Sequence, residues 1–190
     1  ITNVVCHSID YRLAPAHPYP AALDDAVASW RDIVEKNPDC EIILAGDSAG
    51  GGLCLALMMY LRDNGERLPD SAVLFSPWTD LNCESETYTS KAKADPMFIH
   101  YMTKDCAGYY VPESIDRNHP YVSPAYGDFN GLPRTLVMTG ENEILLDDSR
   151  VLGEKASKSG VDIEIDIWPT MFHDWWLFGN FIPETKQCLK

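Results

Sequence analysis

The sequence predicts an α/β fold in which helices flank a mostly parallel sheet. Short apolar runs alternate with longer segments of helical periodicity up to residue 76, and this alternation is typical of parallel strands joined by helical crossovers. A tight glycine-rich turn at residues 46–50 separates one apolar run from an apolar helix. A strand, a helix and a further strand follow after the middle of the chain. With 190 residues, the chain is long enough for one domain with a sizeable core.

The elements of the first half are expected in the following order. Residues 3–10 predict a strand, and the prolines within residues 11–20 forbid regular structure there. Residues 21–37 predict an amphipathic helix, whose apolar residues recur on one face at helical spacing: Leu23, Val27, Trp30 and Val34. A strand at residues 41–45 leads into the glycine-rich turn. The helix after that turn extends to about residue 63, and it is apolar nearly all round, which indicates burial.

The second half departs from simple alternation. A buried strand is expected at residues 71–76, after which residues 77–126 lack a strand pattern for longer than a plain connection allows. We interpret this stretch as a cap- or lid-type insertion in a single domain. The sheet resumes with a strand at residues 136–139, and a helix follows at residues 148–159. Apolar and acidic residues then alternate over residues 161–168, which predicts a strand with one wet face.

Composition limits the partners and the cellular location that can be expected for the chain. The 15 Lys and Arg residues stand against 29 Asp and Glu residues, and a net charge of −14 repels phosphate backbones, so no nucleic-acid partner is expected. No apolar run approaches the ~18–20 residues of a membrane span. Six scattered cysteines without C-x-x-C pairs or zinc spacing indicate no metal site and favour a reducing, cytoplasmic location. Because the chain opens at Ile1 within a strand pattern, we expect it to be a fragment that lacks the N-terminus and any targeting signal there.

One short motif points to chemistry. Residues 46–50 read Gly-Asp-Ser-Ala-Gly between a strand and a helix, which is the sequence form of a nucleophile elbow with Ser48 at its tip. Glycine and serine are common, so a G-x-S-x-G arises by chance in about one chain in twenty of this length. The alternative is a glycine-rich turn with an ordinary serine. The position of the motif between a strand and a helix favours the nucleophile elbow over this alternative.

A nucleophilic serine needs a base and an acid, and behind an elbow the chain order is serine, acid, histidine. Of the five histidines, only His173 follows both the elbow and a strand end beyond an acidic cluster. Four carboxylates near the end of the preceding strand are candidates for the acid, and spacing alone does not choose among them: Glu141, Glu143, Asp147 and Asp148.

Four separated segments resemble one family. Residues 11–25 (YRLAPAHPYPAALDD), 46–51 (GDSAGG), 140–147 (GENEILLD) and 168–173 (WPTMFH) are similar, in this order, to segments of the hormone-sensitive-lipase family of α/β-hydrolases, the bacterial family IV-type esterases. The resemblance spans nearly the whole chain. It implies an α/β-hydrolase fold and a serine carboxylesterase that hydrolyses short- to medium-chain acyl esters without metal or cofactor.

The resemblance also implies roles for individual residues. Ser48 would be the nucleophile, His173 the base and Glu143 the acid, with Asp147 as the reserve for the acid. The backbone N–H of Ala49 would be one oxyanion donor. A deacetylase or amidase of a sterol, sugar or xenobiotic on the same triad is the alternative. A non-catalytic small-molecule receptor of the same fold is the less favoured one.

In this family the insertion covers the acyl pocket, so Met97, Phe98 and Tyr101 are candidates for lining it, although they could equally pack the insertion onto the core. The family's H-G-G-G-type oxyanion loop and the first strands of its sheet are absent from this sequence. A protein of these residues alone is therefore expected to be inactive or poorly folded. A homodimer through the strand at residues 161–168 is a further implication, which the acidic residues of that strand oppose.

Overall fold

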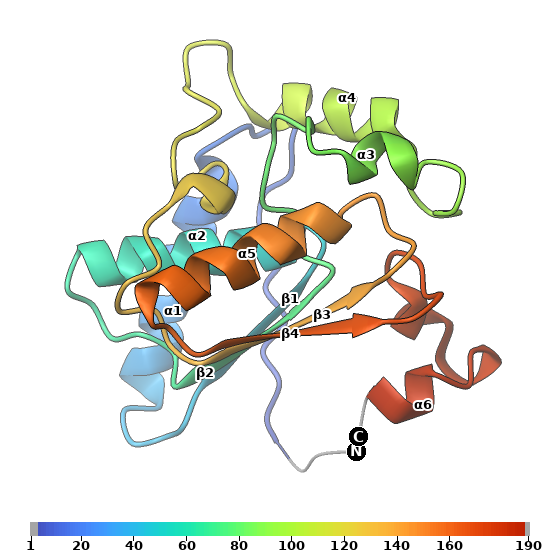
Figure 1. Ribbon diagram of the computed structural model, residues 1–190. Helices are drawn as coiled ribbons and strands as arrows, with labels where there is room; N and C mark the ends of the chain where they lie inside the picture. Colours follow the sequence, from blue (N-terminus) through green and yellow to red (C-terminus); the bar gives the residue numbers. More distant parts are fainter. Residues whose placement is uncertain (1–3, 189–190) are drawn as a thin grey trace.

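The computed structural model describes residues 4–188 of the chain. Within this range four strands form one fully parallel sheet, and their spatial order equals their order in the chain: β1 (Ile43–Asp47), β2 (Ser71–Phe75), β3 (Thr135–Gly140) and β4 (Ile163–Trp168). Because the strands are parallel, their carboxyl ends meet at one edge of the sheet, on the right in Figure 1.

Helices α2 (Ala49–Asp63) and α5 (Leu146–Ser159) cover one face of the sheet, the upper face in Figure 1. Helix α2 packs on β1 and β2, whereas α5 packs on β3 and β4. Between these layers lies the main core, which is formed by apolar side chains of the strands and both helices: Leu55, Met58, Leu74, Val137 and Leu152. Burial of such side chains, at about 1.5–3 kcal/mol each, is the main source of stability for this layer.

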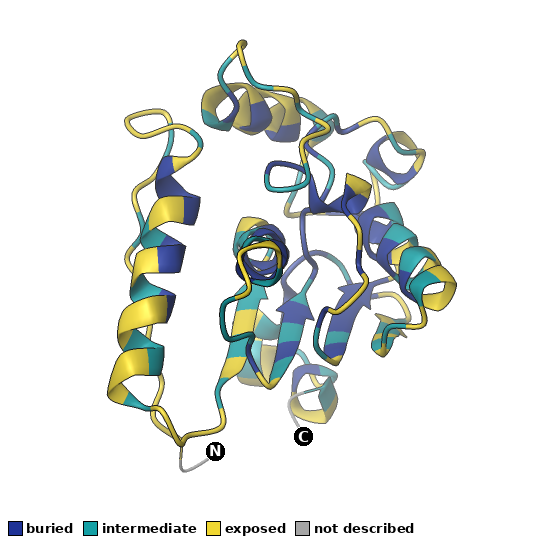
Figure 2. Ribbon diagram, turned by 90° about the vertical axis from the view of Figure 1, so that its left-hand side faces the viewer, coloured by how far each residue is buried: buried dark blue, intermediate teal, exposed yellow. Residues whose placement is uncertain are grey.

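Helix α1 (Ala21–Lys36) packs mainly against α2 and stands beside it in Figure 2. Its buried stripe of apolar residues, one turn apart, forms a separate cluster with the outer side of α2: Leu23, Val27, Trp30, Ala56, Leu57 and Leu61. The expected amphipathic helix is therefore confirmed, with its last helical residue at Lys36.

The insertion at residues 77–126 contains no strand. It holds the short helix α3 (Thr87–Ser90), helix α4 (His100–Tyr110) and the single 3-10 turn η1 (Pro124–Tyr126). Its apolar residues form a third cluster together with two residues of the loop between β3 and α5: Trp78, Tyr88, Val111, Ile144 and Leu145. The insertion thus rests on that loop, next to the carboxyl edge of the sheet.

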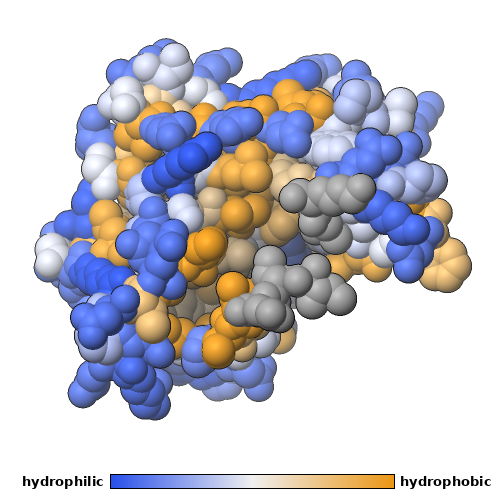
Figure 3. Space-filling model, turned by 90° about the horizontal axis from the view of Figure 1, so that it is seen from below, coloured by the Kyte–Doolittle hydropathy of each residue, from blue (hydrophilic) through white to orange (hydrophobic). Residues whose placement is uncertain are grey.

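The chain ends on the other side of the sheet. The 3-10 segment η2 (Trp175–Phe181) and the short helix α6 (Thr185–Cys188) lie below the sheet in Figure 1. Seen from below in Figure 3, this side of the molecule exposes hydrophobic side chains beside hydrophilic ones. No helix within the described residues is long and apolar enough to cross a membrane.

One expected element is wrong. Of the strand predicted at residues 3–10, residue 3 lies outside the described range and residues 4–10 form no strand. A strand exists only as part of a hydrogen-bonded ladder, and β1 pairs only with β2 among the described residues. Residues 4–10 therefore run exposed along the molecule, although their side-chain pattern suits a sheet.

Candidate active site

Ser48 stands at a sharp turn between β1 and α2. Its backbone has φ 51° and ψ −119°, a conformation that costs a non-glycine residue about 1–3 kcal/mol. Two hydrogen bonds of 2.9 Å hold it, from the Ser48 N–H to the Phe75 carbonyl and from the Trp78 N–H to the Ser48 carbonyl. At Gly46 a Cβ would lie 2.5 Å from the Gly50 carbonyl oxygen, so the tightness of the turn requires glycine there.

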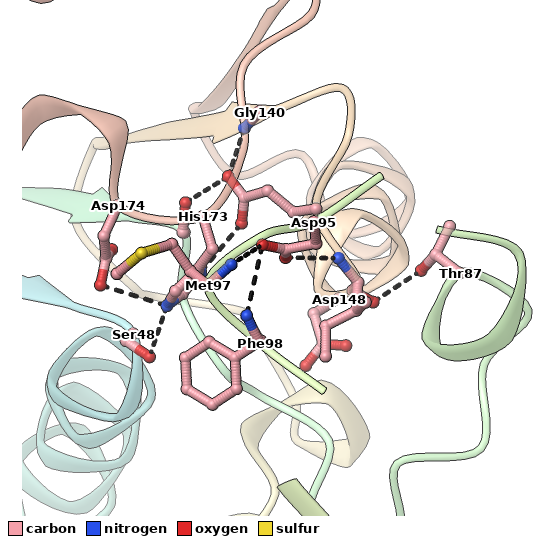
Figure 4. A network of polar contacts seen from close by, with 12 residues as sticks. Ser48, Thr87, Asp95, Met97, Phe98, Gly140, Asp148, His173 and Asp174 are labelled. Atoms are coloured by element: carbon pink, nitrogen blue, oxygen red, sulfur yellow. Dashed lines mark hydrogen bonds and ion pairs between the residues drawn. The ribbon is translucent and has the colours of Figure 1, made fainter. Parts of the chain in front are cut away.

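Three loops at the carboxyl edge bring Ser48, His173 and Glu143 together. His173 Nε2 lies 3.0 Å from Ser48 Oγ, and His173 Nδ1 lies 3.2 Å from a carboxylate oxygen of Glu143. Figure 4 shows this chain of contacts from Ser48 through the His173 ring. Both Glu143 and His173 are fully buried. The distances are those of a serine that donates to an imidazole, which donates in turn to a carboxylate.

Two further donors orient the Glu143 carboxylate. Its Oε1 accepts hydrogen bonds from the Ser76 hydroxyl and the Gly140 N–H, while its Oε2 faces His173. A buried carboxylate without such donors would be strongly destabilised. Ser76 was not among the residues predicted for the site. The signal that could have found it is its position directly after β2, which parallels that of Ser48 after β1.

Of the four candidate carboxylates, Glu143 is the one that contacts His173. The other three bind elsewhere, and their hydrogen-bond partners are Thr170 N–H for Glu141, Thr87 N–H and Arg150 for Asp147, and Thr79 and Asp80 N–H for Asp148. The reserve acid, Asp147, therefore joins the insertion to α5 in this structure and does not reach the imidazole.

Asp174 is a second carboxylate beside the imidazole, and the sequence reasoning did not select it. Its Oδ2 lies 3.1 Å from His173 Nε2, the same nitrogen that faces Ser48. Burial lowers the pKa of His173, but the close contacts with the Asp174 and Glu143 carboxylates and the charges of these groups outweigh burial and raise that pKa to about 9. The only signal in the sequence is adjacency to His173.

The insertion reaches the site through one short segment. The ring of Phe98 meets the His173 ring in a T-shaped contact, with 4.6 Å between ring centroids. Asp95, only 5% exposed, accepts hydrogen bonds from the N–H groups of Met97 and Phe98 and, at 3.1 Å, from that of Ile144 beside Glu143. Asp95 thereby ties the segment before α4 to the loop that carries Glu143 (Figure 4).

The three predicted pocket residues have different positions. Phe98 is partly buried and touches His173, whereas Met97 and Tyr101 are 42% and 64% exposed. Ala49 is the first residue of α2, so its N–H is one of the four that lack a partner within the helix. The positive end of the helix dipole lies there as well, next to Ser48. Residues 4–188 contain no group of three or more His, Cys, Asp or Glu side chains that could hold a metal ion.

Comparison with known proteins identifies the fold family of the chain. The family described as alpha/beta hydrolase fold matches residues 1–177. An acetyl-hydrolase of Streptomyces hygroscopicus is 39% identical over 184 residues, which cover 96% of this chain and 61% of the relative. An esterase of Acinetobacter venetianus is 36% identical over 95% of this chain and 60% of the relative.

A crystal structure of an esterase from the bacterial hormone-sensitive lipase family superimposes with a TM-score of 0.91 at 41% identity. The match covers 95% of this chain and 61% of that structure. The chain thus spans about 60% of the length of the relatives it matches. The sheet, the elbow and the extent of these matches together show that the chain belongs to the alpha/beta hydrolase fold family and is similar to esterases of the bacterial hormone-sensitive lipase type.

Proposed function

We propose that the protein is a serine carboxylesterase that hydrolyses short- to medium-chain acyl esters. The observation that carries the proposal is the buried chain of hydrogen bonds from Ser48 through His173 to Glu143. The relatives described above are named esterase or acetyl-hydrolase, which supports the same reaction class.

In the acylation step, neutral His173 accepts the hydroxyl proton of Ser48 at Nε2 while the serine oxygen attacks the ester carbonyl. Glu143 accepts the Nδ1–H and stabilises the imidazolium that forms. The negative oxygen of the tetrahedral intermediate lies at the start of α2, where the Ala49 N–H is a donor. The intermediate then collapses, the bond to the alkoxy oxygen breaks, and His173 Nε2–H gives its proton to the departing alcohol.

In the deacylation step, a water molecule takes the place of the alcohol. His173 Nε2 accepts a proton from this water as its oxygen attacks the acyl carbonyl of the Ser48 ester. Collapse of the second intermediate releases the carboxylic acid, and the proton on Nε2 returns to the Ser48 oxygen.

The segment at Phe98 is the structural reason to expect small acyl groups. Its ring packs against His173, and Asp95 anchors the segment to the loop of Glu143. Space beside the reacting atoms is therefore bounded by a held aromatic ring. We expect acetyl and butyryl esters to be hydrolysed faster than long-chain acyl esters of the same alcohol.

A second candidate is a deacetylase that removes an acetyl group from a sterol, sugar or xenobiotic. The 39% identity to an acetyl-hydrolase favours it. The same triad serves both activities, so pocket shape decides between them. A panel of p-nitrophenyl esters compared with acetylated sugars, sterols and amides would separate the two. A receptor that binds such a molecule without turnover would bind ligand but resist labelling of Ser48 by a fluorophosphonate.

The direct test is Ser48→Ala in the full-length protein. Loss of the nucleophile removes the acyl-enzyme route, so we expect kcat for p-nitrophenyl acetate to fall by about 10⁴–10⁶-fold. The matched control is Ser157→Ala, which removes a hydroxyl from an exposed position of α5 and should leave kcat unchanged. A folded S48A protein with the turnover of the parent would contradict the proposal.

A further inference from the structure

We propose that Asp174 is a positioning residue that binds the protonated form of His173, and that it thereby sets the pH above which the base becomes active. The proposal rests on the proposed function for its kinetic consequence. The contact between Asp174 and His173 stands independently of that function.

Two different partners share one nitrogen of the imidazole. His173 Nε2 lies 3.0 Å from Ser48 Oγ and 3.1 Å from Asp174 Oδ2, and Figure 4 shows both contacts converging on it. A neutral imidazole that donates Nδ1–H to Glu143 presents a lone pair at Nε2. This lone pair accepts the Ser48 proton but repels a carboxylate oxygen. A protonated imidazole carries a positive charge, and the Asp174 carboxylate, 3.1 Å from Nε2, stabilises that charge as an ion-pair partner. Ser48 and Asp174 therefore favour opposite protonation states.

The surroundings of Asp174 also favour the imidazolium. Asp174 is 7% exposed, and its Oδ1 has no hydrogen-bond partner among the described residues. A buried carboxylate with one unpartnered oxygen is costly unless a positive charge faces it. Its backbone, at φ 56° and ψ 33°, is held in the left-handed region, and the side chain turns back onto the ring of the preceding residue.

The charged groups around His173 are few. Glu143 faces Nδ1 from the β3–α5 loop, and Asp174 faces Nε2 from the histidine loop itself. From the β1–α2 turn comes the neutral Ser48, and from the insertion comes the Phe98 ring. Asp95, the nearby acid of the insertion, accepts from three backbone N–H groups. No Lys or Arg within residues 4–188 pairs with Glu143 or Asp174, so the two carboxylates act on the imidazole without a competing cation.

The consequence concerns the resting enzyme. With both carboxylates ionised, His173 holds a proton on Nε2 that must leave to solvent before Ser48 can be deprotonated. The pKa of about 9 places this loss above neutral pH. When His173 later accepts the serine proton, Asp174 faces the new charge again. Removal of Asp174 should therefore extend the enzyme's activity to lower pH and make His173 a weaker base.

The test is Asp174→Asn in the full-length protein, because asparagine has the same size and tolerates the left-handed region. The matched control is Asp105→Asn on the exposed side of α4, which changes the net charge equally. The primary readout is the NMR titration of His173 with ¹³C-labelled histidine, assigned with a His173→Asn spectrum. We expect D174N to lower the His173 pKa by about 1–3 units, the usual effect of one nearby opposite charge. The acid limb of the pH profile of kcat/KM should shift to lower pH by the same amount. D105N should change neither the His173 pKa nor the acid limb.

An unchanged His173 titration in a folded D174N protein would overturn the proposal. If D174N does not fold, Asp174→Gly relieves the left-handed strain and must show the same downward shift, and its absence would equally overturn the proposal. If Asp174 had only a structural role, its replacement would lower the melting temperature and kcat but would not shift the acid limb of the pH profile of kcat/KM. Because the titration needs no substrate, a protein without esterase activity would refute the proposed function separately, and the NMR shift would still decide the role of Asp174.

Discussion

At the scale of single residues, the site depends on backbone conformations that few side chains adopt. Ser48, Ser76 and Asp174 have φ values of 51°, 42° and 56°, and each of them contacts His173 or Glu143. Such conformations cost about 1–3 kcal/mol each and persist only where the surroundings over-determine them. Here the hydrogen bonds of neighbouring strand ends hold Ser48 and Ser76. The backbone strain therefore lies next to the contacts that join Ser48, His173 and Glu143.

The residue-scale prediction concerns the identity of the acid. In Glu143→Gln, the amide NH₂ can face His173 Nδ1 and stabilise the tautomer whose Nε2 carries the proton. That tautomer cannot accept the Ser48 proton, so we expect kcat to fall by about 10³–10⁴-fold. Steady-state hydrolysis of p-nitrophenyl butyrate by the full-length variant measures this loss.

Asp147→Asn is the matched comparison, because it neutralises the reserve acid four residues further along the chain. Asp147 pairs with Arg150 and Thr87, so its loss should change kcat by only a few-fold. If D147N were the severely impaired variant and E143Q nearly normal, the assignment of the acid would be reversed.

At the scale of elements, Asp148 joins α5 to the base of the insertion. This fully buried carboxylate accepts hydrogen bonds from the N–H groups of Thr79 and Asp80 and from the Tyr88 hydroxyl. Burial raises its pKa to about 7, although these hydrogen bonds and others oppose the increase. The contact fixes where the insertion begins relative to the loop that carries Glu143.

This pKa predicts how stability depends on pH. The folded protein keeps the Asp148 proton up to about pH 7, whereas the unfolded chain releases it near its ordinary pKa of about 3.9. Between these values the folded state binds more protons, so the stabilisation from protonated Asp148 is lost as pH rises. The slope is at most about 1.4 kcal/mol per pH unit. Asp148→Asn should remove most of this decline, which urea unfolding at about pH 5 and about pH 6 would reveal, because the raised pKa of His173 lowers stability with pH only above the ordinary histidine pKa of about 6.5.

Asp105→Asn serves as the control for charge, because Asp105 is exposed on α4. It should show the same decline in the free energy of unfolding as the parent protein. An equally steep decline in D148N would show that another group carries the pH dependence.

At the scale of the whole molecule, two features have opposite effects on the association of two copies. The unpaired side of β4 favours association, and the net charge of −14 opposes it. Among the described strands β4 lies at the edge of the sheet and pairs only with β3. We propose that two copies associate through this edge. The exposed carboxylates of Asp162, just before β4, and of Glu164, within it, would then face those of the other copy and repel them. In each copy, Arg134 lies 3.4 Å from Asp162 and 4.0 Å from Glu164 and offsets part of this negative charge.

The prediction is that association strengthens with salt, because salt screens repulsion between exposed charges. Sedimentation velocity of the full-length protein should show a larger dimer fraction at about 0.3 M NaCl than at about 0.02 M NaCl. Glu164→Gln should raise the dimer fraction at low salt, whereas Glu154→Gln, on the exposed side of α5, should not. A monomer at every salt concentration would contradict the proposal.

Much of the fold could be predicted from the sequence. The helix at Ala21–Lys36, the elbow with α2 behind it and the later strands lie within a few residues of the expected places. The strand at the start of the chain was wrong over residues 4–10, because an alternating pattern shows which side chains suit a sheet but not whether a neighbouring strand is present to pair with it.

The site was predictable only in part. Ser48 and His173 could be selected from motif and chain order, and the structure places them in contact. Spacing left the acid open, and the resemblance to known esterases singled out Glu143. Nothing in the spacing selected Ser76, Asp95 or Asp174, because each of them acts through a contact made by a folded loop.

By itself, the sequence determined the order of strands and helices, the sharp turn at Ser48 and the presence of a histidine beyond the last strand. These are local features, encoded in periodicity and glycine placement over a few residues. Only the tertiary structure decided which carboxylate faces each nitrogen of His173. Ser48 and His173 are 125 residues apart, and the parallel register of β1 to β4 brings their loops to one edge. Contacts of this kind depend on how whole elements pack, and no short stretch of sequence contains that information.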